Sequence, residues 1–324
     1  MKKMKAVVYD RYGSLDNLGL RDIAKPAITP DEVLISVRAA GLHVGDCCGV
    51  KGMPFPVRLF SGLFRPKYGV PGFAVAGTVE AVGAHVKTYS PGDEVFGSAL
   101  GTCAELVRAS PNTLVPKPSK LTFVEAAAIP TSGLAALHGL RDTGKLQSGQ
   151  LVLINGAAGG VGTFAVQIAK ALGAHVTGVC STRNIEMVRA LGADQVVDYT
   201  QQDFTQGSTR YDLILDNVEN RSLSDCRRAL TDVGTLVLNS GTGAEGLAMM
   251  VRLLKPLVLA PFVRQKLRRY VSTPNHADLL VLSQLAESGQ LKPLIDKTYP
   301  LAETRAALEY IDSGHARGKV VVTV

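Results

Sequence analysis

The sequence predicts an α/β protein in which a doubly wound parallel sheet is joined to a second, β-rich domain. Residues 1 to about 122 contain short β-like runs separated by turns such as Pro91-Gly92-Asp93, without a long helical pattern. From Thr122 onward, apolar strands alternate with helical patterns, which is typical of parallel sheets covered by helices. We therefore predict domains at residues 1–122 and 123–271, with residues 272–324 returning to the first domain.

The bulk composition is that of a water-soluble globular protein. The 324 residues are 46% hydrophobic and 19% charged, with a formal charge of +7. Basic residues are scattered except around Arg264–Arg269, so we expect no nucleic-acid partner. Charges and prolines break the apolar run Leu247–Val263, so we expect no integral membrane segment, while surface docking by Leu247–Arg269 stays open. Five cysteines without C-x-x-C spacing favour a cytoplasmic protein.

The first domain is predicted from short runs with β-type composition. These runs are Lys5–Tyr9, Glu32–Ala39, Ala76–Val82, Glu94–Phe96 and Glu105–Arg108. The segment Met53–Pro71, which is rich in Pro, Gly, Phe and Arg, interrupts them. A long irregular loop of this kind is either a functional lid or an insertion.

The parallel sheet is predicted from strands at Leu151–Ile154, His175–Cys180, Gln195–Val197, Tyr211–Leu215 and Thr235–Leu238. Helices are expected at Val124–Ile129, Ser132–Leu140 and Leu223–Leu230, the first two separated by Pro130-Thr131. In the tail we expect helices at His276–Ser288 and Ala302–Ile311 and a strand at Lys319–Val324. Ligands bind such sheets at the carboxyl ends of the strands, the edge that carries Asn217, Ser240 and Gly241.

A Gly-rich turn follows the first strand of that sheet. Residues 157–162 read Ala-Ala-Gly-Gly-Val-Gly, a variant of G-x-G-x-x-G with alanine in the first place. Such a turn lets a pyrophosphate approach the backbone while N–H groups and the helix dipole face its charge. We therefore predict dinucleotide contacts at Ala158, Gly159, Gly160 and Val161. The alternative is an ordinary Gly-rich turn.

The residues after the second strand favour NADPH over NADH. An NAD site would carry Asp or Glu near this point to bind the ribose hydroxyl groups. This chain has Ser181-Thr182-Arg183 instead, and its hydroxyl and guanidinium groups suit a 2′-phosphate. The alternative is that Ser181 only caps the helix Ile185–Leu191 and that Arg183 is a solvated surface charge.

Ordered sequence blocks extend this interpretation to nearly the whole chain. They are Ala39–Asp46, Pro71–Gly83, Pro91–Phe96, Glu125–Thr131, the Gly-rich turn, Cys180–Asn184 and Gly314–Val320. Through these blocks the chain resembles the zinc-free quinone oxidoreductase branch of the medium-chain dehydrogenase/reductase superfamily. It is similar in particular to chloroplast-envelope-type quinone oxidoreductases. The resemblance implies a GroES-like catalytic domain, a Rossmann domain, and nicotinamide bound between them.

The resemblance also implies roles for individual residues. It places Thr131, Asn217, Ser240 and Gly241 near the nicotinamide, Ser181, Arg183 and Tyr199 near the adenosine phosphate, Lys319 among the cofactor contacts, and His43 near the substrate. The family often has Asn-Pro where this chain has His43-Val44.

His43 and Asp46 form a candidate catalytic pair. Imidazole titrates near neutrality, so His43 is a candidate proton donor and Asp46 a candidate orienting carboxylate. The alternative is a structural pair, with the proton coming from water. Where the zinc branch has ligands, this chain has His43 and Phe73-Ala74, and it lacks the four-cysteine lobe, so no metal is expected.

Together these features predict an NADPH-dependent oxidoreductase that passes hydride to a quinone or an α,β-unsaturated carbonyl acceptor without zinc. One alternative is a protein that keeps the NADPH site as a scaffold without turnover, and another is an alcohol dehydrogenase. The partner expected is a small-molecule enone, enal or quinone. A homodimer is expected from the habit of the family.

Overall fold

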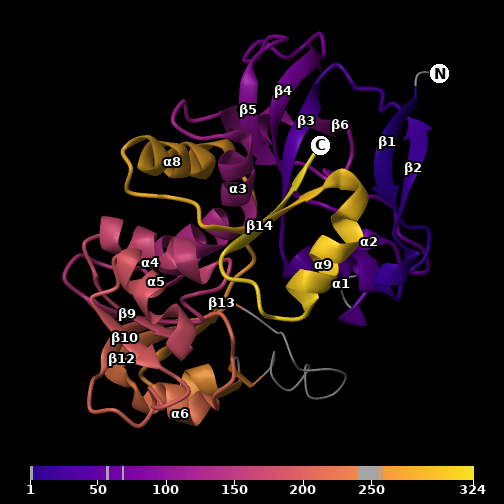
Figure 1. Cartoon of the computed structure of the whole chain (residues 1–324). Helices are drawn as coiled ribbons and strands as arrows, with labels where there is room; N and C mark the ends of the chain where they lie inside the picture. Colours follow the sequence, from indigo (N-terminus) through magenta and orange to yellow (C-terminus); the bar gives the residue numbers. More distant parts are fainter. Residues whose placement is uncertain (1–2, 56–57, 68, 240–254, 257) are drawn as a thin grey trace. The chain divides into compact units, whose positions relative to one another are not determined.

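The computed structural model describes residues 3–55, 58–67, 69–239, 255–256 and 258–324. The predicted contacts at Ser240 and Gly241 therefore lie outside the described residues, as does part of Leu247–Arg269. The chain forms two compact units, Met1–Leu134 with Thr273–Val324, and Ala135–Ser272 (Figure 1). Within the described ranges, every helix is too short or too polar to cross a bilayer.

The first unit is built on a mostly antiparallel sheet. Its strand order is β14 (Ile295–Pro300), β15 (Lys319–Thr323), β3 (Val33–Leu42), β4 (Ala74–Val82), β5 (Glu94–Ser98) and β7 (Leu114–Pro116), with β6 (Leu106–Ala109) paired to β3. A separate two-stranded sheet joins β1 (Lys3–Val8) and β2 (Gly19–Ala24). Strand β15 pairs with β3 so that Val320 faces Leu42, which brings the end of the chain beside an early strand.

The helices of the first unit come from both ends of the chain. They are α1 (Val44–Lys51), α2 (Arg58–Ser61), α8 (His276–Glu287), α9 (Thr304–Asp312) and most of α3 (Phe123–Leu137). Figure 1 shows the yellow helix α9 beside the indigo helix α1, and the two helices are in contact.

Helix α3 corrects one prediction from the sequence. Instead of two helices separated at Pro130-Thr131, one helix runs through Pro130 and continues into the π-helical stretch His138–Thr143. A proline inside a helix costs about 3 kcal/mol, because it removes one hydrogen bond and crowds the preceding turn. Residues 126–129 of α3 are fully buried, and burial of this apolar face outweighs that cost.

The second unit contains the predicted doubly wound sheet. Six parallel strands lie in the order β10 (Gln195–Asp198), β9 (His175–Cys180), β8 (Leu151–Asn155), β11 (Tyr211–Asp216), β12 (Leu230–Leu238) and β13 (Lys266–Arg269). Helices α4 (Gly162–Ala171), α5 (Ile185–Ala190) and α6 (Leu223–Arg228) connect them. The order reverses between β8 and β11, and this switch point is where such sheets bind ligands.

The buried strands form because their residues are apolar on both faces. Val152, Leu153 and Ile154 of β8 are fully buried, as a central parallel strand requires. The last strand, β13, reads Lys-Leu-Arg-Arg and lies at the edge of the sheet, where charged residues are tolerated and discourage further pairing. The basic cluster at Arg264–Arg269 is therefore largely an edge strand.

Candidate cofactor and catalytic site

The Gly-rich turn lies between the carboxyl end of β8 and helix α4. Gly156 has a φ of 78°, a left-handed conformation that favours glycine. A Cβ atom on Gly162 would lie 2.0 Å from the carbonyl oxygen of Gly156, so only glycine fits at the start of the helix. A Cβ atom on Gly159 would have its nearest neighbour, the Gly156 carbonyl oxygen, at 3.4 Å, so a side chain there would meet only an ordinary contact within the protein.

This turn presents backbone N–H groups without acceptors. The N–H of Ala157 donates to Val179 and that of Gly159 to Gly156, both at 3.0 Å. The N–H groups of Ala158, Gly160 and Val161 find no acceptor among the described residues. They sit at the N-terminus of α4, where the helix dipole also favours an anion.

A network of polar side chains stiffens the carboxyl edge of the sheet beside the turn. Asn155, at the end of β8, donates from Nδ2 to Asp216 Oδ1 at 2.8 Å and to Asn220 Oδ1 at 3.0 Å. Asp216 is fully buried and also accepts from the backbone N–H of Glu219 at 2.8 Å. Asn155, Asp216 and Asn220 were not predicted, although the first two each end a buried apolar strand.

The predicted residue Asn217 belongs to the same network. Its Nδ2 donates to the carbonyl oxygen of Asn155 at 3.1 Å, and its Oδ1 accepts from Asn239 Nδ2 at 2.8 Å. A Cβ atom on Gly156 would meet the Cβ atom of Asn217 at 3.6 Å, so Asn217 lies directly beside the Gly-rich turn. The structure thus brings the turn and Asn217 to one edge.

The residues predicted to bind a 2′-phosphate follow β9. Ser181 makes no capping hydrogen bond, and its hydroxyl accepts from Asn184 Nδ2 at 3.1 Å. Ser181 is the N-cap position of the 3-10 turn Thr182–Asn184, which leads into α5, whereas the N-cap of α5 itself is Asn184. Arg183 is exposed and forms no ion pair or hydrogen bond with any described residue. Tyr199 is 52% exposed, and its backbone N–H donates to Cys180 at 3.0 Å.

An acidic residue that was not predicted from the sequence lies close to these residues. Asp198 ends β10 and pairs in register with Cys180, the last residue of β9. Its carboxylate accepts from Thr182 Oγ1 at 2.6 Å and from Thr200 Oγ1 at 2.8 Å. The hydrogen bond from Thr182 is the main cause that lowers the pKa of Asp198, so this carboxylate is ionised at neutral pH.

His43 and Asp46 meet at the start of α1. Asp46 is 1% exposed and accepts from His43 Nδ1 at 2.6 Å, from the His43 backbone N–H at 2.8 Å and from the Gly72 N–H at 3.0 Å. The imidazole edge packs against the Phe73 ring at 5.5 Å between centroids. Asp46 therefore fixes the ring with Nδ1 inward, which leaves Nε2 as the ring nitrogen open to other partners.

Lys319 lies inside the first unit. It is 2% exposed, and its Nζ donates to the carbonyl oxygen of Leu42 at 2.6 Å and to Ser132 Oγ at 3.0 Å. Leu42 precedes His43, and Ser132 follows the half-buried Thr131. The ammonium group therefore ties together the backbone around two predicted site residues. Cofactor contact by Lys319 stays a prediction.

Burial gives Lys319 a testable effect on stability. Desolvation lowers its pKa from 10.5 to about 8. Between these values the unfolded chain holds a proton that the folded protein lacks, so stability rises with pH across this window, by up to about 3 kcal/mol. In urea unfolding, we expect the stability of the wild type relative to Lys319→Met to increase from pH 7 to pH 10. A difference that stays constant with pH would show that Lys319 does not titrate in this way.

The cysteines are packed as apolar side chains. Cys47, Cys103, Cys180 and Cys226 are buried, and Cys48 is partly buried. Desolvation raises the pKa of Cys47 and of Cys226 to about 12, which disfavours the thiolate form that binds zinc.

Comparison with known proteins gives consistent matches along the chain. Residues 29–180 match the alcohol dehydrogenase GroES-like domain, and residues 191–322 match a family described as zinc-binding dehydrogenase. An NADPH-dependent alkenal/one oxidoreductase, chloroplastic, of Arabidopsis thaliana is 32% identical over 99% of this chain and 80% of its own length. A chloroplast envelope quinone oxidoreductase homolog of the same plant is 32% identical, covering 99% and 98%. The structure of the quinone oxidoreductase from Coxiella burnetii has a TM-score of 0.86 at 32% identity, covering all of both chains.

Proposed function

The chain belongs to the medium-chain dehydrogenase/reductase family, as an oxidoreductase of the quinone oxidoreductase type, and we propose that it is a zinc-independent, NADPH-dependent reductase of quinones or α,β-unsaturated carbonyls. The observation that carries the proposal is the turn at the switch point, with three N–H groups that lack acceptors among the described residues. Relatives named as quinone and alkenal/one oxidoreductases support the two acceptor classes.

The residues present fit a dinucleotide. The N–H groups of Ala158, Gly160 and Val161 would bind the pyrophosphate oxygens, and the lack of a side chain on Gly159 allows close approach. The buried carboxylate of Asp216 accepts from Asn155 and from backbone N–H groups, so the edge needs little rearrangement on binding.

Arg183 is the residue that would select NADPH. Its guanidinium has no partner among the described residues, so a 2′-phosphate would gain a charge-assisted hydrogen bond without breaking an existing one. The nearby Asp198 carboxylate opposes this choice by its charge, but Thr182 and Thr200 already donate to both of its oxygens. We therefore propose that Arg183 binds the 2′-phosphate on the adenosine ribose, with Ser181 and Tyr199 beside it.

When bound, the reduced nicotinamide supplies hydride to the acceptor. An acceptor that receives hydride develops negative charge on its oxygen and needs a proton. We propose that His43, protonated on both ring nitrogens, gives this proton from Nε2 and is left neutral, while Asp46 keeps the Nδ1–H hydrogen bond throughout. A proton from water, with His43 and Asp46 as a structural pair, is the alternative. The cytoplasmic location and the homodimer remain predictions.

The proposal is tested by the choice of acceptor. We expect steady NADPH oxidation with simple quinones or conjugated enals and little oxidation of ethanol with NADP. Without a metal to stabilise an alkoxide, transfer is favourable mainly where the acceptor itself delocalises the arriving charge. Ethanol oxidation without quinone or enone reduction would favour an alcohol dehydrogenase. NADPH binding without turnover across the whole panel would favour the scaffold alternative.

We also predict that the purified protein contains no stoichiometric zinc and keeps its activity in a chelator. Four of the cysteine thiols are buried, and Phe73-Ala74 stands where the zinc branch has ligands. Elemental analysis with activity assays before and after dialysis against EDTA measures this. One tightly held zinc ion per chain, with activity lost on its removal, would contradict the prediction.

A further inference from the structure

The segment that follows α1 combines positive charge with exposed apolar side chains. Residues 47–79 contain the basic residues Lys51, Arg58, Arg65 and Lys67 and no acidic residue. Between residues 53 and 64, five apolar side chains are exposed: Met53 at 42%, Phe55 at 56%, Leu59 at 68%, Leu63 at 43% and Phe64 at 85%. Single exposed apolar residues are ordinary, but a cluster of this density marks an interaction surface.

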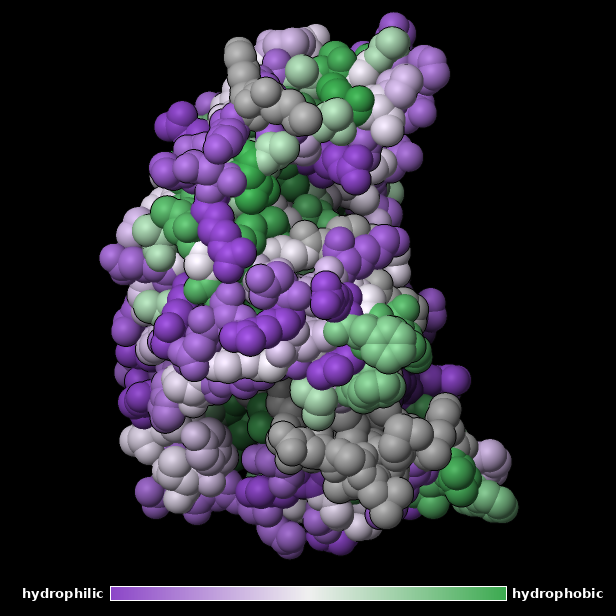
Figure 2. All heavy atoms as spheres, turned by 90° about the vertical axis from the view of Figure 1, so that its right-hand side faces the viewer, coloured by the Kyte–Doolittle hydropathy of each residue, from purple (hydrophilic) through white to green (hydrophobic). Residues whose placement is uncertain are grey.

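The described part of this segment, residues 53–55 and 58–67, is anchored by contacts with Tyr12 and Gly52. Tyr12 donates its hydroxyl proton to the carbonyl oxygen of Gly62 at 2.7 Å. The Arg58 guanidinium lies 4.7 Å from the centre of the Tyr12 ring, and its Nε donates to the Gly52 carbonyl at 2.9 Å. The apolar side chains are therefore presented by a loop that the rest of the first unit supports. Figure 2 shows that hydrophobic side chains reach the surface on this side, among hydrophilic ones.

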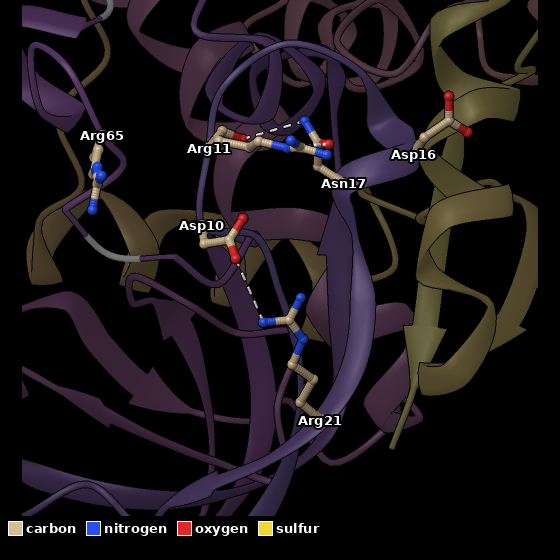
Figure 3. Close-up of a pocket in the computed structure, with 6 residues that line it drawn as sticks. All are labelled: Asp10, Arg11, Asp16, Asn17, Arg21 and Arg65. Carbon is tan, nitrogen blue, oxygen red and sulfur yellow. Dashed lines mark hydrogen bonds and ion pairs between the residues drawn. The ribbon is translucent and has the colours of Figure 1, made fainter.

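Arg65, which follows Phe64 in sequence, lies at a charged hollow. Arg65 lines it together with Arg11, Arg21, Asn17 and two aspartates, Asp10 and Asp16, around a space of about 510 Å³ (Figure 3).

The arginines of this hollow outweigh its acids. Asp10 pairs with Arg21 at 3.7 Å, and Asp16 pairs with Arg305. Arg11 donates only to the neutral Asn17, at 2.9 Å, and Arg65 has no partner among the described residues. The hollow therefore carries an excess of positive charge that suits a phosphate group.

We propose that the described residues 53–55 and 58–67 dock the protein on an anionic lipid surface, with Phe55, Leu59 and Phe64 entering the headgroup region and Arg65 and Lys67 contacting lipid phosphates. The apolar side chains protrude, and a fluid lipid interface accepts protruding side chains without a matching pocket. The basic residues without acidic neighbours in sequence supply the attraction to negative headgroups. This inference is independent of the proposed function.

Sedimentation of the full chain with lipid vesicles tests the proposal. We expect binding to phosphatidylcholine vesicles that contain phosphatidylglycerol, little binding to phosphatidylcholine alone, and weakening by salt. The double variant Leu59→Ser, Phe64→Ser is expected to bind about tenfold or more weakly, because two apolar side chains no longer enter the interface. Arg65→Glu should also weaken binding to the anionic vesicles, because it reverses the charge of a side chain that we place against lipid phosphates.

The control is Val271→Ser, which removes a 90% exposed apolar side chain from the other unit, outside the segment Leu247–Arg269. It should bind like the wild type, and thermal unfolding of all variants checks that each is folded. The absence of binding to anionic vesicles, equal binding to both vesicle types, or an equal loss of binding in Val271→Ser would overturn the proposal. An acidic protein partner in place of lipid would give the first of these results.

Discussion

Replacing Arg183 with alanine is expected to weaken NADPH binding roughly 10- to 150-fold and to leave NADH binding nearly unchanged. A hydrogen bond to a charged group contributes ~1.5–3 kcal/mol, and this range converts to that change in the dissociation constant. The guanidinium of Arg183 has no partner among the described residues, so its removal should cost the fold little. Fluorescence titration of wild type and variant with each cofactor measures the effect.

The matched control for Arg183 is Arg189→Ala. Arg189 is also an exposed arginine, on α5, but its guanidinium pairs with Glu186 at 2.8 Å. The variant Arg189→Ala should change neither the NADPH nor the NADH dissociation constant. Ser181→Asp should go further than Arg183→Ala, because a carboxylate repels the phosphate and offers the ribose hydroxyl groups an acceptor. If Arg183→Ala weakens both cofactors alike, the 2′-phosphate is not bound by this turn.

Gly162→Ala is expected to destabilise the protein by about 2–4 kcal/mol and to weaken binding of both cofactors. Its Cβ atom would lie 2.0 Å from the Gly156 carbonyl oxygen and 2.7 Å from Ala157 Cα, and both are backbone atoms that cannot swing aside. Relief requires α4 to move away from the turn, which costs packing and displaces the N–H groups. Urea unfolding with cofactor titration measures the two effects.

Gly159→Ala separates binding from folding in the same turn. Its Cβ atom would have its nearest neighbour at 3.4 Å, an ordinary contact, so stability should stay near that of the wild type. The added methyl group would occupy space that we assign to the pyrophosphate, so both cofactors should bind more weakly. This placement of the pyrophosphate would be contradicted if Gly159→Ala bound both cofactors like the wild type. It would also be contradicted if Gly159→Ala lost as much stability as Gly162→Ala.

Much of the parallel sheet could be predicted because buried parallel strands are short, continuous apolar runs. The run Leu151–Ile154 was predicted as a strand for this reason, and β8 spans Leu151–Asn155. The edge strand β13 could not be predicted in this way, because Lys266, Arg268 and Arg269 hide it as a basic cluster. Pro130 led to the prediction of two helices in place of α3. The burial that keeps α3 continuous depends on neighbours that are distant in sequence, so it could not be predicted.

The candidate cofactor and catalytic site was also only partly predictable from the sequence. Asn217 could be placed at the sheet edge because it follows an apolar strand, and the structure puts it beside the Gly-rich turn. Asp198 could not be predicted as a neighbour of Ser181–Arg183, because it ends a different strand, β10. The pairing register of β9 and β10, which sets Asp198 opposite Cys180, brings it close to the residues that follow β9. The burial of Lys319 likewise depends on pairing across the whole chain.

If this chain transfers hydride from NADPH to a conjugated acceptor, a label on the nicotinamide should appear in the product. The most direct measurement uses NADPH carrying deuterium at both C4 positions of the nicotinamide, a short enal and a simple quinone as acceptors, and mass spectrometry of the products. We predict one deuterium at carbon in each molecule of reduced enal, and one molecule of NADPH consumed for each molecule of either product. Unlabelled enal product, or a protein that binds NADPH and turns over neither acceptor, would contradict the claim.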